Sequence, residues 1–151
     1  MMNRKIFFLC SALFSAPLMA FPCFFTLVKD SCWTDYTVTV NVTNVDTNQP
    51  IITVSIPAGQ TWVRQPFTCQ PSEKIVYTAT FEPSIWEQTE GQVYKAKRYW
   101  QLPSAATPKQ KAWEVPVCFP AAFAEVPFPP KASGNCKCDF SSVTPIPLQS
   151  Q

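Results

Sequence analysis

The chain has 151 residues, enough for one domain, with 12 Lys and Arg against 10 Asp and Glu and no histidine. Without histidine, a Ser-His-Asp or Cys-His catalytic arrangement is excluded. The three glycines are dispersed, which excludes a Gly-rich phosphate-binding loop.

Residues 1–20 are typical of a signal peptide. Arg4 and Lys5 form a positive start, residues 6–14 are almost entirely apolar, and Leu18-Met19-Ala20 offers a small residue for cleavage. The apolar run is well short of the ~20 residues that a membrane-spanning helix needs. We therefore predict export to the periplasm or the medium, most compatible with a bacterial source, and a mature chain without a transmembrane span.

Cleavage after Ala20 changes the charge of the chain. It removes two of the 12 basic residues and none of the 10 acidic ones, so the mature chain is formally neutral. Affinity for a phosphate backbone grows with the number of basic contacts, and only Lys95, Lys97 and Arg98 form a basic cluster. A nucleic-acid partner is therefore not expected.

Strand patterns occupy the middle of the mature chain. Residues 21–35 form an aromatic, cysteine-bearing N-terminal strip. Residues 36–42 alternate apolar and polar side chains, 44–48 form a polar turn, and 52–56 alternate again, which together predict a β-hairpin. Further strands are predicted at 61–64, 75–81, 92–100 and 113–117.

The C-terminal third is rich in proline: more than half of the 16 prolines follow residue 102. We predict that residues 118–140 form an irregular strap over the sheets, because proline fixes φ and lowers the entropy lost on ordering. Residues 141–151 are predicted to be a loose tail. The fold class is all-β, a small disulfide-stapled antiparallel β-sandwich spanning 21–140, with an Ig-like strand order as our guess.

Six of the seven cysteines remain after cleavage: Cys23, Cys32, Cys69, Cys118, Cys136 and Cys138. An even number in an exported chain predicts a disulfide framework. A zinc site at the last two is the alternative, but no histidine or second paired motif supports it, and no metal or cofactor is predicted. We expect the first two cysteines to pair with the last two, and the middle two with each other.

Acidic and aromatic residues offer the remaining candidate sites. Glu82, Glu87 and Glu90 surround Trp86, where paired carboxylates could hydrolyse a sugar, although charges that keep a loop soluble explain them more simply. Among the five tryptophans, Trp33 and Trp113 have the pattern of core residues. The prediction for a partner-binding surface falls on Trp86 and Trp100, which have polar neighbours.

Three strings carry a resemblance: residues 21–33, 97–103 and 136–142. They resemble small periplasmic proteins of intracellular bacterial pathogens. Some proteins of that kind are similar to accessory subunits of the outer-membrane core of type IVB (Dot/Icm) secretion machines. The resemblance implies a place in an envelope assembly and assigns no residue a role.

These observations predict a non-enzymatic periplasmic domain that binds protein, as a small structural or accessory subunit of a cell-envelope assembly of the secretion type. Missing catalytic groups, neutral charge and abundant aromatic residues favour an interface over a reaction site. Two alternatives stay open: a secreted carbohydrate-binding module that uses exposed tryptophans, and a small carboxylate-dependent hydrolase.

Overall fold

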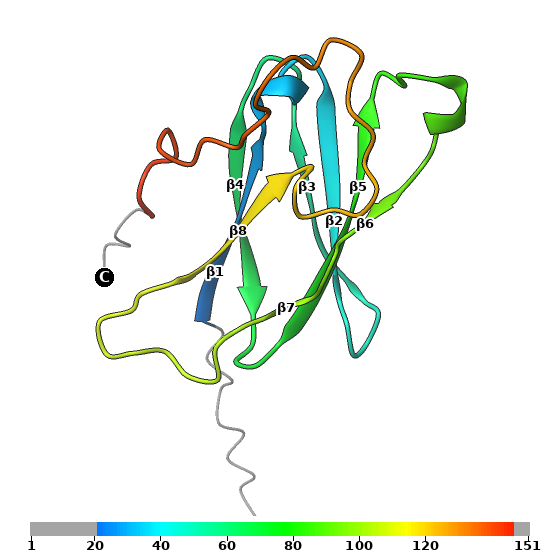
Figure 1. Cartoon of the computed structure of the whole chain (residues 1–151). Helices are drawn as coiled ribbons and strands as arrows, with labels where there is room; N and C mark the ends of the chain where they lie inside the picture. The colour runs from blue at the N-terminus through cyan, green and yellow to red at the C-terminus, as the bar shows by residue number, and fades with distance from the viewer. Residues whose placement is uncertain (1–20, 147–151) are drawn as a thin grey trace, which may run out of the picture.

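The computed structural model describes residues 21–146, which form two facing β-sheets (Figure 1). The predicted signal peptide, 1–20, and the end of the predicted tail, 147–151, lie outside the described residues. The elements are β1 (Phe21–Lys29), η1 (Ser31–Trp33), β2 (Thr37–Asn44), β3 (Pro50–Ile56), β4 (Trp62–Cys69), β5 (Lys74–Glu82), η2 (Glu87–Thr89), β6 (Tyr94–Lys95), β7 (Trp100–Gln101) and β8 (Trp113–Phe119). Within residues 21–146, no helix has the length and apolarity needed to cross a membrane.

The strands confirm the predicted all-β class. The first sheet has the order β4-β1-β8, and the second has the order β3-β2-β5-β6 with β7 also paired to β5. All pairs are antiparallel except β1 with β8, which run parallel. A β-sandwich with one parallel pair therefore replaces the fully antiparallel one, and the Ig-like strand order stays a prediction.

The predicted hairpin is β2 with β3. Val38, Val40 and Val42 are buried on one face of β2, as their alternation with polar residues requires. The turn between the strands is held by Asn44, whose side-chain oxygen accepts hydrogen bonds from the backbone N–H groups of Asp46 and Thr47, both at 2.9 Å. Local sequence therefore determines this part of the fold.

Strand β1 is the main element that the sequence pattern does not reveal. It is the middle strand of its sheet, and its residues from Phe25 to Lys29 are all buried. Thr26 points away from the core, yet it is covered because Arg64 and Glu114 both hydrogen-bond to its hydroxyl. A strand covered on both faces shows no alternation of apolar and polar residues.

The predicted strand at 92–100 was wrong in extent, because it is split into β6 and β7. After β6, the N–H of Ala96 still donates to the carbonyl of Tyr77 in β5 at 2.9 Å. On its other edge this segment pairs with the strap: Ala96 forms a bridge with Phe123, and the N–H of Lys97 donates to the carbonyl of Ala122 at 3.0 Å.

Three disulfides are present, but the predicted pairing was wrong for two of them. Cys32–Cys136 joins the N-terminal and C-terminal segments as expected, whereas the other bridges are Cys23–Cys69 and Cys118–Cys138. The antiparallel register of β1 with β4 puts Cys69 opposite Phe21 and therefore beside Cys23. Without β1 in the prediction, this neighbourhood could not be foreseen.

The irregular C-terminal strap is held by disulfides at Cys118, Cys136 and Cys138 as predicted, but it begins two residues later than predicted. Residues 118 and 119 still belong to β8, and the irregular segment begins after them. Phe119 and Phe123 are buried in the core, whereas Phe128 is 75% exposed. In the predicted tail, the carbonyl of Pro145 accepts a hydrogen bond from Arg64 at 3.5 Å, so the described part of the tail contacts β4.

At the end of β1, Lys29 is a buried cation that joins three segments. Its side chain is 2% exposed, and its ammonium donates hydrogen bonds to the carbonyls of Thr34 at 3.2 Å, Tyr36 at 2.6 Å and Pro57 at 2.9 Å. Burial lowers its pKa, and the nearby Asp35 carboxylate acts in the opposite direction. The ammonium therefore fixes η1, the start of β2 and the loop after β3 to one another.

Candidate functional site

A cavity opens at the end of the sandwich where β2 begins and β5 ends, the upper end in Figure 1. We call it the end cavity; its volume is about 630 Å³. Its lining residues are Asp35, Thr37, Ala58, Thr80, Phe81, Glu82, Pro83, Ser84, Glu90, Gly91 and Gln92. They come from the start of β2, the loop after β3, the end of β5 and the two ends of the β5–β6 loop.

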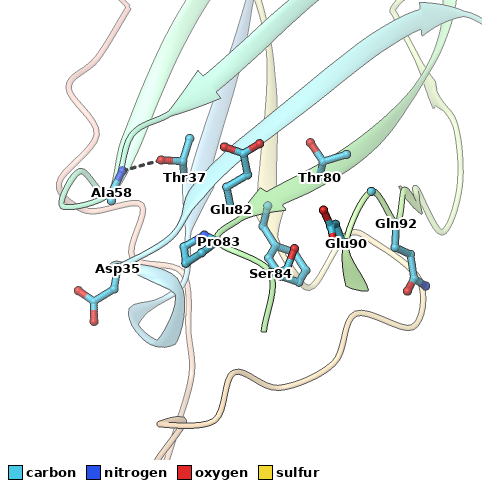
Figure 2. Close-up of a pocket in the computed structure, with 11 residues that line it drawn as sticks. Asp35, Thr37, Ala58, Thr80, Glu82, Pro83, Ser84, Glu90 and Gln92 are labelled. Atoms are coloured by element: carbon cyan, nitrogen blue, oxygen red, sulfur yellow. Dashed lines mark hydrogen bonds between the residues drawn. The ribbon is translucent and has the colours of Figure 1, made fainter. Parts of the chain in front are cut away.

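Strand geometry explains the polar lining. Phe81 is buried, so its neighbours Thr80 and Glu82 point outward from the same strand. Glu82 is paired across the sheet with Thr37, whose hydroxyl accepts a hydrogen bond from the N–H of Ala58 at 3.2 Å. Figure 2 shows Glu82 and Thr80 beside Glu90 around one opening.

The β5–β6 loop forms a compact turn around Thr89. The buried Thr89 hydroxyl donates to the carbonyl of Trp86 at 2.8 Å and accepts from the N–H groups of Ile85 and Trp86 at 3.1 and 3.2 Å. Ile85 packs against the core, whereas Trp86 is 43% exposed. The loop therefore holds Trp86 toward solvent between the two segments that line the end cavity.

A second, smaller cavity adjoins the first and shares Asp35 and Pro83 with it. We call it the proline cavity, because Pro129 and Pro130 of the strap also line it; its volume is about 220 Å³. The exposed ring of Phe128 immediately precedes Pro129. This end of the domain thus combines two neighbouring cavities with exposed aromatic side chains on the segments that form them.

Three carboxylates line the end cavity: Asp35, Glu82 and Glu90 are all exposed to solvent within it. Of the glutamates singled out around Trp86, two are therefore brought to one cavity, while Glu87 is not part of its lining. Negative charge with neighbouring hydroxyl and amide groups can receive a cationic or hydrogen-bonding group.

The other predicted contact residue, Trp100, lies in a different place. It is half-buried in β7 and lines a cavity of about 390 Å³ with Tyr77, Lys97 and Arg98, which we call the Trp100 cavity. The structure therefore assigns Trp86 and Trp100 to separate elements. Trp33 and Trp113 are buried, which confirms their predicted place in the core.

A metal site at the cysteines is ruled out by their oxidation. Asp30, Cys32 and Cys136 bring potential ligand atoms within 4.8 Å of one another, but the two sulfurs are joined in a disulfide. Metal binding needs the thiolate form. The Asp30 carboxylate instead accepts a hydrogen bond from the N–H of Cys32 at 2.9 Å and caps η1.

The chain matches no protein-family model, no curated protein and no solved structure.

Proposed function

We propose that the chain is an extracytoplasmic, non-enzymatic domain that binds a partner protein at the end of the sandwich formed by the end cavity and the proline cavity. The observation that carries the proposal is the carboxylate-lined end cavity, together with the exposed Trp86 on the loop whose two ends line that cavity. In our proposal a basic side chain of the partner enters the cavity and an apolar one packs on Trp86. Charge complementarity would favour the right partner, and the aromatic contact would supply affinity.

The rigidity of this end supports a binding role. Cys32–Cys136 ties η1 to the strap, and Lys29 fixes the loop that contains Ala58. Thr89 holds the loop of Trp86 in a hydrogen-bonded turn. A surface that is already ordered loses less conformational entropy when it binds, so more of the contact energy contributes to affinity.

The exposure of Glu82 and Glu90 favours binding over catalysis. A carboxylate-dependent hydrolase needs one carboxyl group that stays protonated near neutral pH and a site that limits access of bulk water. Both glutamates stand in an open cavity in contact with solvent. We therefore propose that these groups attract a ligand and do not transfer protons.

Three disulfides fit an oxidising compartment, which agrees with the predicted signal peptide. Together with the resemblance of the sequence, this supports a place as a small subunit of an envelope assembly of the secretion type. Intact-mass analysis of the exported protein tests the location: the proposal expects a chain that starts at Phe21. An exported chain that still starts at Met1 would contradict it.

Site-specific photocrosslinking in the native host tests the binding surface. A benzophenone amino acid in place of Trp86 or Phe128 should give a crosslinked product of defined mass with one protein. The same probe in place of Thr68, an exposed residue of β4, is the control and should give none. The identified partner should then bind the purified domain, and Glu82→Gln with Glu90→Gln should weaken that binding without lowering the melting temperature.

The proposal fails if the control position crosslinks to the same protein as efficiently, because contact would then not depend on this end of the domain. It also fails if the double glutamine variant binds the purified partner as tightly as the wild type.

A further inference from the structure

We propose that the Trp100 cavity is a second binding site, with specificity for a sugar ring that carries a carboxylate. Two segments of the chain supply most of the lining. Lys97, Arg98 and Trp100 come from the segment that leads into β7, and Pro116 and Ala122 come from β8 and the start of the strap. Its volume of about 390 Å³ is within the range of small-ligand sites, which starts near 300 Å³.

The cavity carries positive charge that the protein does not neutralise. Lys97 and Arg98 are both exposed, and within residues 21–146 the ion pair of Arg64 with Glu114 is the only one formed. Two adjacent cations at a cavity attract an anion. Arg98 can also bind a carboxylate through two parallel hydrogen bonds, which fixes the orientation of the ligand.

Tyr77 adds a phenol to the lining of the cavity. Its side chain is 5% exposed, and its ring packs against Phe25 and Phe123 at centroid distances of 5.8 and 5.3 Å. Among the described residues, no hydrogen bond is made by its hydroxyl. Burial raises the pKa of Tyr77, and the charge of Arg98, which lines the same cavity, opposes that rise.

The ring of Tyr77 is buried, but its hydroxyl is not enclosed by protein, and Tyr77 lines the cavity together with Arg98. The phenol can donate one hydrogen bond to a carboxylate or a sugar hydroxyl. Together, Tyr77 and Arg98 therefore provide two directed contacts to one ligand.

The partly buried indole of Trp100 determines the rest of the ligand. A flat aromatic surface packs well against a flat apolar surface, such as the C–H face of a pyranose ring. A ring with that face and a carboxylate at its edge is a uronic acid. Two basic residues are too few to bind the extended phosphate backbone of a nucleic acid.

This site is independent of the proposed protein-binding end, because the Trp100 cavity and the end cavity share no lining residue. Either proposal can fail without the other.

NMR titration of the oxidised mature protein tests the site with three probes. Methyl glucuronide should shift the indole N–H signal of Trp100 in a saturable manner, and added salt should weaken its binding. Methyl glucoside, which lacks the carboxylate, should bind about tenfold more weakly or not at all, because it cannot form the charge-assisted hydrogen bonds to Arg98. Inorganic phosphate should not saturate the same signal at comparable concentration.

Three variants separate the contacts. Arg98→Ala should weaken glucuronide binding about tenfold, and Tyr77→Phe, which keeps the ring, should weaken it several-fold. Lys111→Ala, at an exposed position outside the cavity, should bind like the wild type. Equal binding of glucoside and glucuronide, equal binding of phosphate, or full binding by Arg98→Ala would each overturn the proposal.

Discussion

Replacement of Lys29 by methionine removes a buried charge and keeps most of the side-chain volume. Three backbone carbonyls, of Thr34, Tyr36 and Pro57, lose the ammonium that they share in the wild type. Because these carbonyls belong to three different segments, the substitution should loosen the end of the sandwich and lower the free energy of unfolding.

The size of the effect follows from the three hydrogen bonds. A hydrogen bond to a charged group contributes about 1.5–3 kcal/mol, and the longest of the three, at 3.2 Å to Thr34, should contribute least. The cost of burying the ammonium, visible in the lowered pKa of Lys29, reduces the sum. An adjoining cavity of about 300 Å³ also lets water reach the carbonyls in the variant. We expect a net loss of about 3 kcal/mol, or roughly 10 °C in melting temperature for a domain of this size.

Denaturant unfolding of the oxidised proteins measures this loss. Lys137→Met is the matched control, because Lys137 lines the same cavity but is exposed, and it should change stability by less than about 0.5 kcal/mol. A Lys29→Met protein as stable as that control would show that the three carbonyls do not depend on the ammonium, and the reasoning would be refuted.

Three further predictions concern stability. Trp113→Ala should lower the free energy of unfolding by about 3–5 kcal/mol in denaturant unfolding, because its ring is buried. Trp86→Ala should leave the melting temperature nearly unchanged, because its ring is exposed. Effects of similar size for the two variants would contradict these positions. Burial raises the pKa of Asp30 in the folded protein above 3.8, the ordinary value for an aspartate. The stability of the wild type relative to Asp30→Asn should therefore increase as the pH falls through the native pKa toward 3.8. Unfolding curves at several pH values that showed no such trend would contradict this. Removal of both Cys23 and Cys69, which enclose a separation of 46 residues, should cost about 4 kcal/mol of unfolding free energy, and non-reducing peptide mapping of the wild type should recover the two in one fragment.

Local patterns predicted the second sheet better than the first. In β2 the alternation of Val38, Val40 and Val42 with polar residues is visible because one face of that strand is exposed to solvent. In β1 the same signal is absent, since Thr26 and Val28 are buried on the face that points away from the core. The position of β1 between β4 and β8 depends on contacts distant in sequence, which no local pattern encodes.

The candidate site was predicted in composition and not in arrangement. The sequence indicated Glu82, Glu90 and Trp86 as neighbours in one loop, and the structure brings the two carboxylates to a single cavity. Asp35 was not foreseen, because it reaches the cavity from the start of β2. Tyr77 was predicted only as a strand residue, and the structure shows that it lines one cavity with Trp100 and Arg98.

The connectivity of the disulfides limits how the chain can be oxidised. No bridge joins two cysteines that are consecutive in the sequence; the bonded pairs are Cys23–Cys69, Cys32–Cys136 and Cys118–Cys138. A chain that was oxidised in the order of its synthesis, each thiol pairing with the one before it, would contain none of the native bridges. The native set requires either that Cys32 stays reduced while Cys23 pairs with Cys69 and until Cys136 of the strap is in place, or that early bonds rearrange by exchange with free thiolates. Efficient production of the protein therefore depends on a compartment, or a refolding buffer, that reshuffles disulfides as readily as it forms them.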